Sequence, residues 1–411
     1  MVSEKMYDKL ANLVVIKGVN VQKDQPVVIR ANVRDAAFVR KIVKCAYEAG
    51  SGAVSVEWSD NDITKMAYEY ESVEALSEVP QWKYDKVKHQ HDRGACYISV
   101  LSDPPGVMAD VDGEKIKAAN RAYYAKMADL MTYTMNNEGQ WSVIGVPSVE
   151  WANKVFPELD EKEAYEKLGD AIFAVTRVTE DNDPIEEWNK HDAEMLEHAS
   201  KMNEFGFEKL HFTAGNGTDL YVELVKDHIW IAGGSTTPGG IFFDPNMPTE
   251  ECFCMPLRTG ACGIVYASKP LDYEGKVIDG FWLRFENGKA VEFGAEKEEE
   301  ALAQLLSFDE GSSYLGEVAL VPYDSPISQS GILFFNTLYD ENAACHLALG
   351  RAYPENLVGG TEMSKEELAA HGSNDSMQHV DFMIGTADMN VDGILKDGTA
   401  VPVFRDGNFV F

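Results

Sequence analysis

The chain has 411 residues, of which 45% are hydrophobic, and this length predicts two domains rather than one. Its 36 lysine and arginine residues stand against 68 aspartate and glutamate residues, so the formal net charge at pH 7 is -32. This negative charge is spread along the chain, and it argues against binding to nucleic acid or to anionic membrane surfaces.

Six cysteines lie in apolar stretches without the paired spacing of a zinc ribbon or of a small disulfide-rich domain. They predict reduced thiols in a cytoplasmic protein. Residues 1–8 lack the apolar segment of a signal peptide, and the sequence contains no run of about 18 apolar residues. We therefore expect neither export nor a membrane span.

The first half of the chain alternates between short apolar runs and amphipathic segments. Residues 26–30 predict a buried strand, Asp35 begins a helix that ends near Ala49, and residues 53–57 predict a second strand. Together they form a β-α-β unit with parallel strands. No glycine-rich phosphate-binding motif follows the first strand, so we expect a plain α/β scaffold rather than a nucleotide-binding domain.

The same alternation continues with strands at 95–100 and 141–146 and with a helix through residues 121–131. Such a pattern is typical of a doubly wound, mostly parallel sheet. Residues 181–184, Asp-Asn-Asp-Pro, favour an exposed turn. We therefore predict an N-terminal α/β domain in residues 1–185.

Residues 186–411 predict a C-terminal α+β domain with a largely antiparallel sheet. After a helix through 188–205, strands at 209–213 and 220–224 flank Asn216-Gly217, a dipeptide typical of a type I′ hairpin turn. Few helices interrupt the strand-like runs that follow. These runs lie at 263–267, 281–285, 317–321 and 332–335.

The segment Met377–Gly385 combines a strand pattern with polar residues. Because side chains alternate along a strand, His379, Asp381 and Met383 share one face, and apolar residues occupy the other. A histidine and a carboxylate at positions i and i+2 suit a divalent cation. The structural alternative is a hydrogen-bonded His–Asp pair in a core strand.

Three earlier segments place polar residues in apolar or turn-rich surroundings. Glu250 and Glu251 precede an apolar run, so one of these acids should point inward. Glu317 stands near the start of an apolar strand, where an unpaired charge would be costly. His346 lies among small apolar residues, where a core histidine would also fit. With His379 and Asp381, these residues approximate the set that two adjacent divalent ions need.

In order and spacing, the four segments resemble the thermophilic-type metalloaminopeptidases of the M29 family, and the resemblance extends over the whole chain. The segments are Asn246–Glu251, Leu315–Val321, Asp340–Gly350 and His379–Gly385. The resemblance implies a dinuclear centre of two divalent metal ions, for which zinc, cobalt and manganese are all suitable. It also implies the metal ligands, which are Glu251, Glu317, His346, His379 and Asp381.

The chain departs from the family at Cys252-Phe253-Cys254, where the family pattern is Val-Phe-Thr. Thiolates at this point could ligate zinc. A strand would send both cysteines to one face and Phe253 to the other, and we expect buried thiols. Because adjacent residues face opposite ways, the resemblance favours Glu251 as a ligand and leaves Glu250 beside the centre or at the surface.

The resemblance further implies an aminopeptidase that releases N-terminal amino acids from short peptides by means of a metal-bound water or hydroxide. Tyr353 falls where the family has a catalytic tyrosine, which would donate a hydrogen bond to the oxyanion. Glu341 and Glu250 are candidates for the general base. Family members are dimers, so a homodimer is expected. The alternatives are another dinuclear metal-dependent hydrolase and a non-catalytic acidic binding protein.

Overall fold

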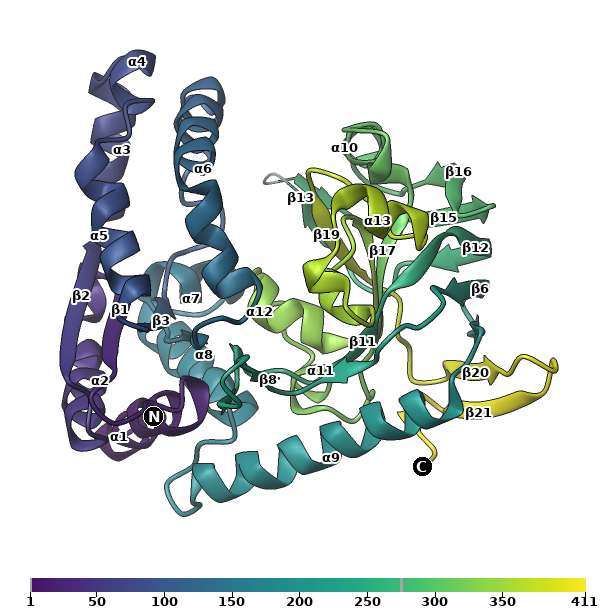
Figure 1. The fold of residues 1–411 in the computed structure, drawn as a ribbon, viewed down its shortest axis with the longest axis horizontal. Helices are drawn as coiled ribbons and strands as arrows, with labels where there is room; N and C mark the ends of the chain where they lie inside the picture. Colours follow the sequence, from purple (N-terminus) through teal and green to yellow (C-terminus); the bar gives the residue numbers. More distant parts are fainter. Residues whose placement is uncertain (1, 274–275) are drawn as a thin grey trace. The chain divides into compact units, whose positions relative to one another are not determined.

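The computed structural model describes residues 2–273 and 276–411 (Figure 1). Its chain divides into two compact units. The first unit comprises Met1–Asn189 and Gly234–Pro248, and the second comprises Lys190–Gly233 and Thr249–Phe411. The predicted domains, 1–185 and 186–411, stay a prediction. They assign residues 234–248 to the second domain, whereas in the structure these residues belong to the first unit.

A five-stranded sheet with the order β10-β4-β3-β1-β2 forms the centre of the first unit. All four pairings are parallel, as predicted for a doubly wound sheet. Its strands are β1 (Pro26–Asn32), β2 (Ala53–Ser59), β3 (Cys96–Leu101), β4 (Trp141–Gly145) and β10 (Asn246–Met247). Five of the seven residues of β1 are buried, because helices cover both faces of a parallel sheet. A small hairpin of β8 (Ser235–Thr236) and β9 (Phe242–Phe243) completes the strands of this unit.

Most helices of the first unit begin at a serine or aspartate whose side chain accepts a hydrogen bond from the first turn, as at Ser3, Asp60 and Asp112. The predicted helix after Asp35 is present, and the helix predicted through 121–131 extends over Gly113–Met135. The helices are α1 (Glu4–Leu13), α2 (Ala36–Glu48), α3 (Asn61–Tyr70), α4 (Val73–Leu76), α5 (Gln81–Asp92), α6 (Gly113–Met135), α7 (Val149–Val155) and α8 (Glu161–Val175), with a π-helix at Val14–Gly18 and a 3-10 turn at Val33–Asp35.

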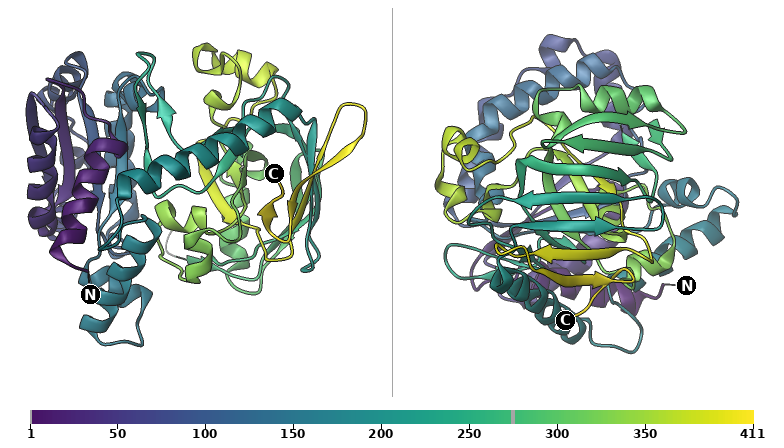
Figure 2. Two further views of the ribbon diagram at one scale, coloured as in Figure 1. Left: turned by 90° about the horizontal axis from the view of Figure 1, so that it is seen from below. Right: turned by 90° about the vertical axis from the view of Figure 1, so that its right-hand side faces the viewer.

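Two large antiparallel sheets and one two-stranded sheet form the second unit. The larger has eight strands in the order β16-β15-β12-β6-β5-β20-β21-β22, with the C-terminal strands at one edge (Figure 2, right). The smaller has the order β19-β18-β17-β11-β7. The strands of the larger sheet are β5 (Lys209–Thr213), β6 (Asp219–Leu224), β12 (Pro256–Tyr266), β15 (Trp282–Glu286), β16 (Lys289–Gly294), β20 (Asn390–Ile394), β21 (Ala400–Arg405) and β22 (Asn408–Phe409).

The core of the second unit lies between its two sheets. It joins Phe212 and Leu220 of the larger sheet to Val318, Leu347 and Phe382 of the smaller one. The strands of the smaller sheet are β7 (Ile231–Ala232), β11 (Cys252–Cys254), β17 (Leu315–Leu320), β18 (His346–Gly350) and β19 (His379–Met383), and β13 (Leu271–Tyr273) pairs with β14 (Lys276–Ile278). The helices are α9 (Pro184–Phe205), which begins in the first unit, α10 (Glu299–Leu306), α11 (Pro326–Ser330), α12 (Thr337–Asp340) and α13 (Lys365–Ala370), with short 3-10 turns at 311–313, 341–343, 354–356 and 360–362.

Two local predictions are wrong. The loop between β5 and β6 spans residues 214–218, and Gly217 has a positive φ of 102° whereas Asn216 does not, so the turn is not type I′. Residues 332–335 do not form a strand, because the backbone N–H of Phe334 donates to the Asp340 carboxylate at 2.7 Å instead of to a neighbouring strand. No helix in the described part of the chain has the length and apolar character of a membrane span.

Candidate metal centre

The register of the smaller sheet gathers the predicted ligands on one face. Ala319 of β17 pairs with His346 of β18, and Ala348 of β18 pairs with Asp381 of β19. Paired residues of antiparallel strands share a face, and so do residues two apart on one strand. Glu317 and His379 therefore lie on this same face. We call it the polar face of the sheet.

The opposite face of the same strands is apolar and belongs to the core. Val318, Leu347 and Phe382 are each at most 1% exposed. Along β19 the predicted alternation is confirmed, since Phe382 and Ile384 are core residues and Val380 packs against them. This apolar anchoring holds the polar side chains of the other face in fixed positions.

Small residues leave room above the polar face. Ala319 and Ala348 stand between the polar side chains, and Gly350 pairs with His379 at the end of β18. A larger side chain at Ala319 or Ala348 would extend into the space into which the carboxylates and imidazoles project. The strand β11 extends the face, because Phe253 pairs with Ala319 and Glu251 lies two residues earlier.

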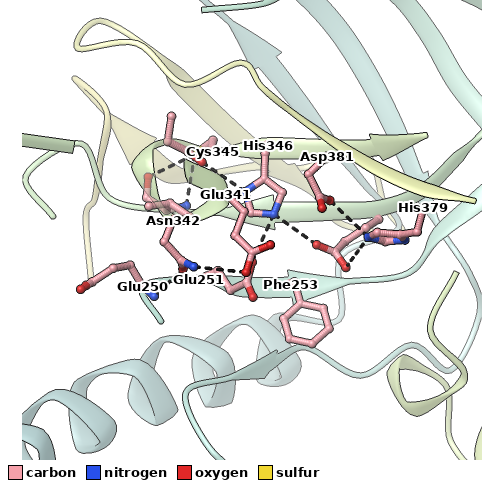
Figure 3. Close-up of polar contacts among 12 residues, drawn as sticks. Glu250, Glu251, Phe253, Glu341, Asn342, Cys345, His346, His379 and Asp381 are labelled. Carbon is pink, nitrogen blue, oxygen red and sulfur yellow. Dashed lines mark hydrogen bonds and ion pairs between the residues drawn. The ribbon is translucent and has the colours of Figure 1, made fainter. Parts of the chain in front are cut away.

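The polar side chains form two groups that share one residue (Figure 3). In the first group, the Nε2 atom of His346 lies 3.1 Å from Oε2 of Glu251 and 3.2 Å from Oε1 of Glu317. In the second, Nε2 of His379 lies 3.8 Å from Oε2 of Glu317 and 3.2 Å from Oδ1 of Asp381. The potential ligand atoms of each group lie within 4.8 Å of one another. Glu317 thus directs one oxygen to each histidine.

Both histidines are oriented through their other ring nitrogen. Nδ1 of His379 lies 2.7 Å from the carbonyl oxygen of Arg351, and Nδ1 of His346 lies 3.2 Å from that of Ala344. A carbonyl accepts a hydrogen bond, so these contacts place a proton on Nδ1. In a neutral imidazole the lone pair is then on Nε2, which is the arrangement that metal-binding histidines use.

Burial and mutual contacts shift the pKa values of the acids and histidines of the centre. Burial, with the neighbouring acids Glu251 and Asp381, raises the pKa of Glu317, although hydrogen bonding to His346 opposes this. Burial alone would lower the pKa of His346, but its hydrogen bonds to Glu251 and Glu317 outweigh that effect and raise the pKa well above its usual value. In the same way Asp381 raises the pKa of His379 to about 10.

The donor set fits divalent metal ions. Four carboxylates lie close together here, those of Glu251, Glu317, Glu341 and Asp381. Among the described residues, no lysine or arginine lies within ion-pair distance of them. Oδ1 of Asp381 is buried without a hydrogen bond, because its contact with His379 lacks hydrogen-bond geometry. Buried carboxylates whose only nearby cationic side chains are histidines are typical of a metal site, because a divalent ion offsets the cost of burying their charge.

Glu341 is the fourth carboxylate of the centre, and it belongs to neither ligand group. It lies in the 3-10 turn before β18, and its side chain points toward Glu251 and His346 (Figure 3). Burial and the charges of Glu251 and Asp381 raise its pKa well above the usual value. This carboxyl group therefore binds a proton readily next to the ligand groups.

Glu250 points away from the centre (Figure 3). It is 3% exposed, so it is not a surface residue, and its carboxylate lies 3.8 Å from Nε2 of His191. Cys252 and Cys254 are fully buried on the core face, and Phe253 is partly exposed on the other face, as strand alternation predicted. Burial raises the pKa of both thiols.

Tyr353 borders the second ligand group. Its ring lies 4.6 Å from the ring of His379 and 6.4 Å from that of Phe253, and the residue is 39% exposed. Burial of its hydroxyl and the charge of Glu317 raise its pKa, so the hydroxyl stays protonated as a hydrogen-bond donor.

Three structural features that support the centre were not predicted from the sequence. Asn342 is fully buried and accepts a hydrogen bond from the backbone N–H of Glu250 at 2.7 Å, which fixes the chain next to Glu251. The carbonyl of Arg351 orients His379. Gly316 occupies a bulge in β17 immediately before Glu317. Only the glycine had a sequence signal, since glycine within a strand often marks a bulge.

Comparison with known proteins identifies the family of the chain. A family model described as thermophilic metalloprotease (M29) matches residues 3–409. Aminopeptidase AmpS of Bacillus subtilis (strain 168) is 47% identical over 401 residues, which cover 98% of this chain and 97% of that protein. Aminopeptidase 2 of Geobacillus stearothermophilus is 45% identical over 408 residues, which cover 99% and 98%.

A solved structure has the same fold. Wild-type AmpT from Thermus thermophilus matches with a TM-score of 0.92 and 38% sequence identity, over 99% of this chain and 100% of that one. The resemblance predicted from four short segments is therefore confirmed along the whole chain. The chain belongs to the thermophilic metalloprotease (M29) family and is a metalloaminopeptidase.

Proposed function

We propose that the chain releases N-terminal amino acids from short peptides at a centre of two divalent metal ions. The observation that carries this proposal is the position of Glu317, which belongs to both ligand groups and directs one oxygen to each. A carboxylate shared in this way suits two neighbouring ions. Glu251 and His346 would complete the ligands of one ion, and His379 and Asp381 those of the other.

When bound, the two ions would lower the pKa of a water molecule and hold the free amine of the peptide. Tyr353 is proposed to donate its hydroxyl proton in a hydrogen bond to the oxygen of the scissile carbonyl as negative charge develops there. Its partial exposure leaves the ring accessible to a substrate. The contact between the rings of Tyr353 and His379, 4.6 Å apart, supports this role.

Glu341 is our proposed general base, which takes a proton from the attacking water and passes it to the leaving amine. Its side chain points toward Glu251 and His346, which supports this role. The Glu250 carboxylate points away from the cluster, so we do not assign it this role. Glu250 is proposed instead to support the segment that holds Glu251.

The identity of the metal, the cellular compartment and the oligomeric state are proposed as follows. Carboxylates with two imidazoles suit zinc, cobalt and manganese, and metal availability would decide among these ions. The six cysteines are free, which supports our proposal of a cytoplasmic protein. A homodimer is proposed from the resemblance to the family.

The test compares an unblocked leucine anilide with its N-acetylated form, using protein whose metal content has been measured. We expect cleavage of the unblocked anilide only, and two metal ions per chain. Glu317→Gln should lower the occupancy of both ions, whereas Asp381→Asn should lower that of one. Equal cleavage of both anilides would favour another dinuclear hydrolase, and a single ion in the parent protein would refute the dinuclear centre.

A further inference from the structure

A cavity of about 420 Å³ lies at the carboxyl end of the parallel sheet in the first unit. Its walls come from the segments that follow β1 and β4 and from helices α1, α2 and α8. All its lining residues fall between Glu4 and Tyr165, so none belongs to the candidate metal centre. Small-molecule sites in proteins commonly measure about 300–1,000 Å³. The cavity is therefore large enough for a small metabolite.

The point at which the strand order of the sheet reverses lies between β1 and β3, next to the cavity. From β1 the chain crosses through α2 to β2 on one side, and it later returns to β3 on the other side of β1. The chain thus winds in opposite directions from the carboxyl ends of β1 and β3, and open parallel sheets bind ligands where this happens. Ser102, which follows β3, donates across the gap to Asp35, which follows β1, at 2.6 Å.

Three acids line the cavity: Glu4 contacts Lys41, Glu150 contacts Arg34, and Asp35 is paired with neither cation. Asp35 is 8% exposed, and Ser102 donates to its Oδ2 atom. Among the described residues, no donor reaches its Oδ1 atom, and no lysine or arginine lies within ion-pair distance of it. Burial raises its pKa to about 6, so the carboxyl group is still ionised at neutral pH. A buried carboxylate with a free oxygen favours a ligand that carries an ammonium group.

Two cations line the same cavity. Arg34 donates to Asn32 through Nε and to Glu150 through Nη1, at 3.2 and 2.9 Å. A guanidinium has five N–H donors, so Arg34 retains donors for a second carboxylate. Lys41 contacts Glu4 and Asp8 at 2.7 and 2.6 Å, and it too has a third donor. The cavity thus offers both signs of charge.

Aromatic and apolar side chains form the remaining wall. The rings of Tyr7 and Phe38 lie 5.8 Å apart, and the hydroxyls of Tyr7 and Tyr165 lie 3.3 Å apart. Val146 and Pro147 add apolar surface next to them. An apolar or aromatic side chain would bury its surface against these groups.

We propose that this cavity binds a free α-amino acid with an apolar or aromatic side chain. Its ammonium group binds Asp35, its carboxylate faces Arg34 and Lys41, and its side chain packs against Tyr7 and Phe38. A metalloaminopeptidase releases ligands of this class, so the site would sense accumulated product. The inference does not rest on the dinuclear centre, because no residue is common to both sites.

The test is a fluorine NMR titration of the metal-loaded full-length chain with 4-fluoro-L-phenylalanine. We expect a bound resonance whose affinity falls about tenfold or more in Asp35→Asn, because a charge-assisted hydrogen bond is lost. Asparagine can still accept the Ser102 hydroxyl, so the fold should persist, and thermal unfolding without ligand checks this. The matched control is Asp8→Asn, which removes an acid that contacts Lys41 but does not line the cavity. It should retain the resonance.

Two further measurements test which group of the ligand is recognised and whether the ligand binds in this cavity. N-acetyl-4-fluoro-L-phenylalanine lacks the ammonium group, and it should not produce the resonance. His346→Gln should lose peptidase activity and keep the resonance, which separates the cavity from the metal centre. Unchanged affinity in Asp35→Asn, equal binding of the acetylated compound, loss of the resonance in His346→Gln, or no bound resonance in the parent chain would each overturn the proposal.

Discussion

Gly316→Ala should disable the enzyme although the substitution adds a single methyl group and removes no polar atom. Gly316 is buried in the bulge that shifts the register between β17 and β18, and Glu317 follows it directly. A Cβ atom at this position would stand 2.5 Å from the carbonyl carbon of Arg351 and closer still to the carbonyl oxygens of Gly350 and Arg351. These are backbone atoms, so no side chain can rotate away to make room.

The size of the effect follows from this contact. Ordinary contacts begin near 3.4 Å, so the two strands must separate by about 1 Å at this point. Overpacking of this kind costs about 1–3 kcal/mol of stability, which a folded domain can tolerate. A displacement of about 1 Å at a catalytic group can lower the rate about 100-fold. Because Glu317 belongs to both ligand groups, the displacement affects both.

The assay is the turnover of an unblocked leucine anilide together with metal content and thermal unfolding. We expect turnover to fall about 100-fold, with weaker metal retention and a folded chain. The matched control is Gly113→Ala at the start of α6, where an added Cβ meets no atom within 4 Å, and this variant should behave as the parent. Parent-like turnover and metal content in Gly316→Ala would refute our account of how Glu317 is positioned.

Three other predictions concern the same centre. Tyr353→Phe should lower kcat by about 100-fold while metal content stays constant, since one oxyanion donor is worth about 3 kcal/mol; unchanged kcat would remove Tyr353 from the mechanism. Glu251→Gln should lower metal content, whereas Glu250→Gln should retain it, because only Glu251 belongs to a ligand group; the opposite result by elemental analysis would exchange their roles. After metal removal, the free energy of unfolding should fall as pH rises above about 4.5, because the raised pKa of Glu341 lets the folded chain hold a proton that the unfolded chain releases. The raised pKa of His346 acts in the same direction above pH 6.5, because the stability it adds is present at lower pH and is lost as pH rises through the folded value. Denaturant unfolding measures this slope, Glu341→Gln should flatten it, and a metal-free chain that grows more stable over this range would contradict it.

The sequence by itself determined the local features of the strands. Alternation along Met377–Gly385 predicted which side chains of β19 enter the core and which face the other way, and the structure confirms this division. The same rule predicted that the thiols of Cys252 and Cys254 share one face and are buried, and both residues are buried in the structure. Alternation is a property of the backbone of a single strand, so it can be read without knowledge of neighbouring strands.

The sequence also indicated the family, because four short segments in a fixed order are more specific than any one of them. Taken alone, His379 and Asp381 were compatible with a structural pair. The match over residues 3–409 confirms the family, whereas the assignment of individual ligands is still our proposal.

Only the tertiary structure decided which candidates meet. The register that pairs Ala319 with His346 and Ala348 with Asp381 depends on contacts between strands about 30 residues apart, and no local pattern encodes it. Glu341 and Glu250 were equal candidates in the sequence and lie outside the strands, and only the folded structure shows that Glu341 points toward the centre and Glu250 away from it. Local backbone geometry thus set the direction of each side chain within a strand, and packing between distant strands set its neighbours.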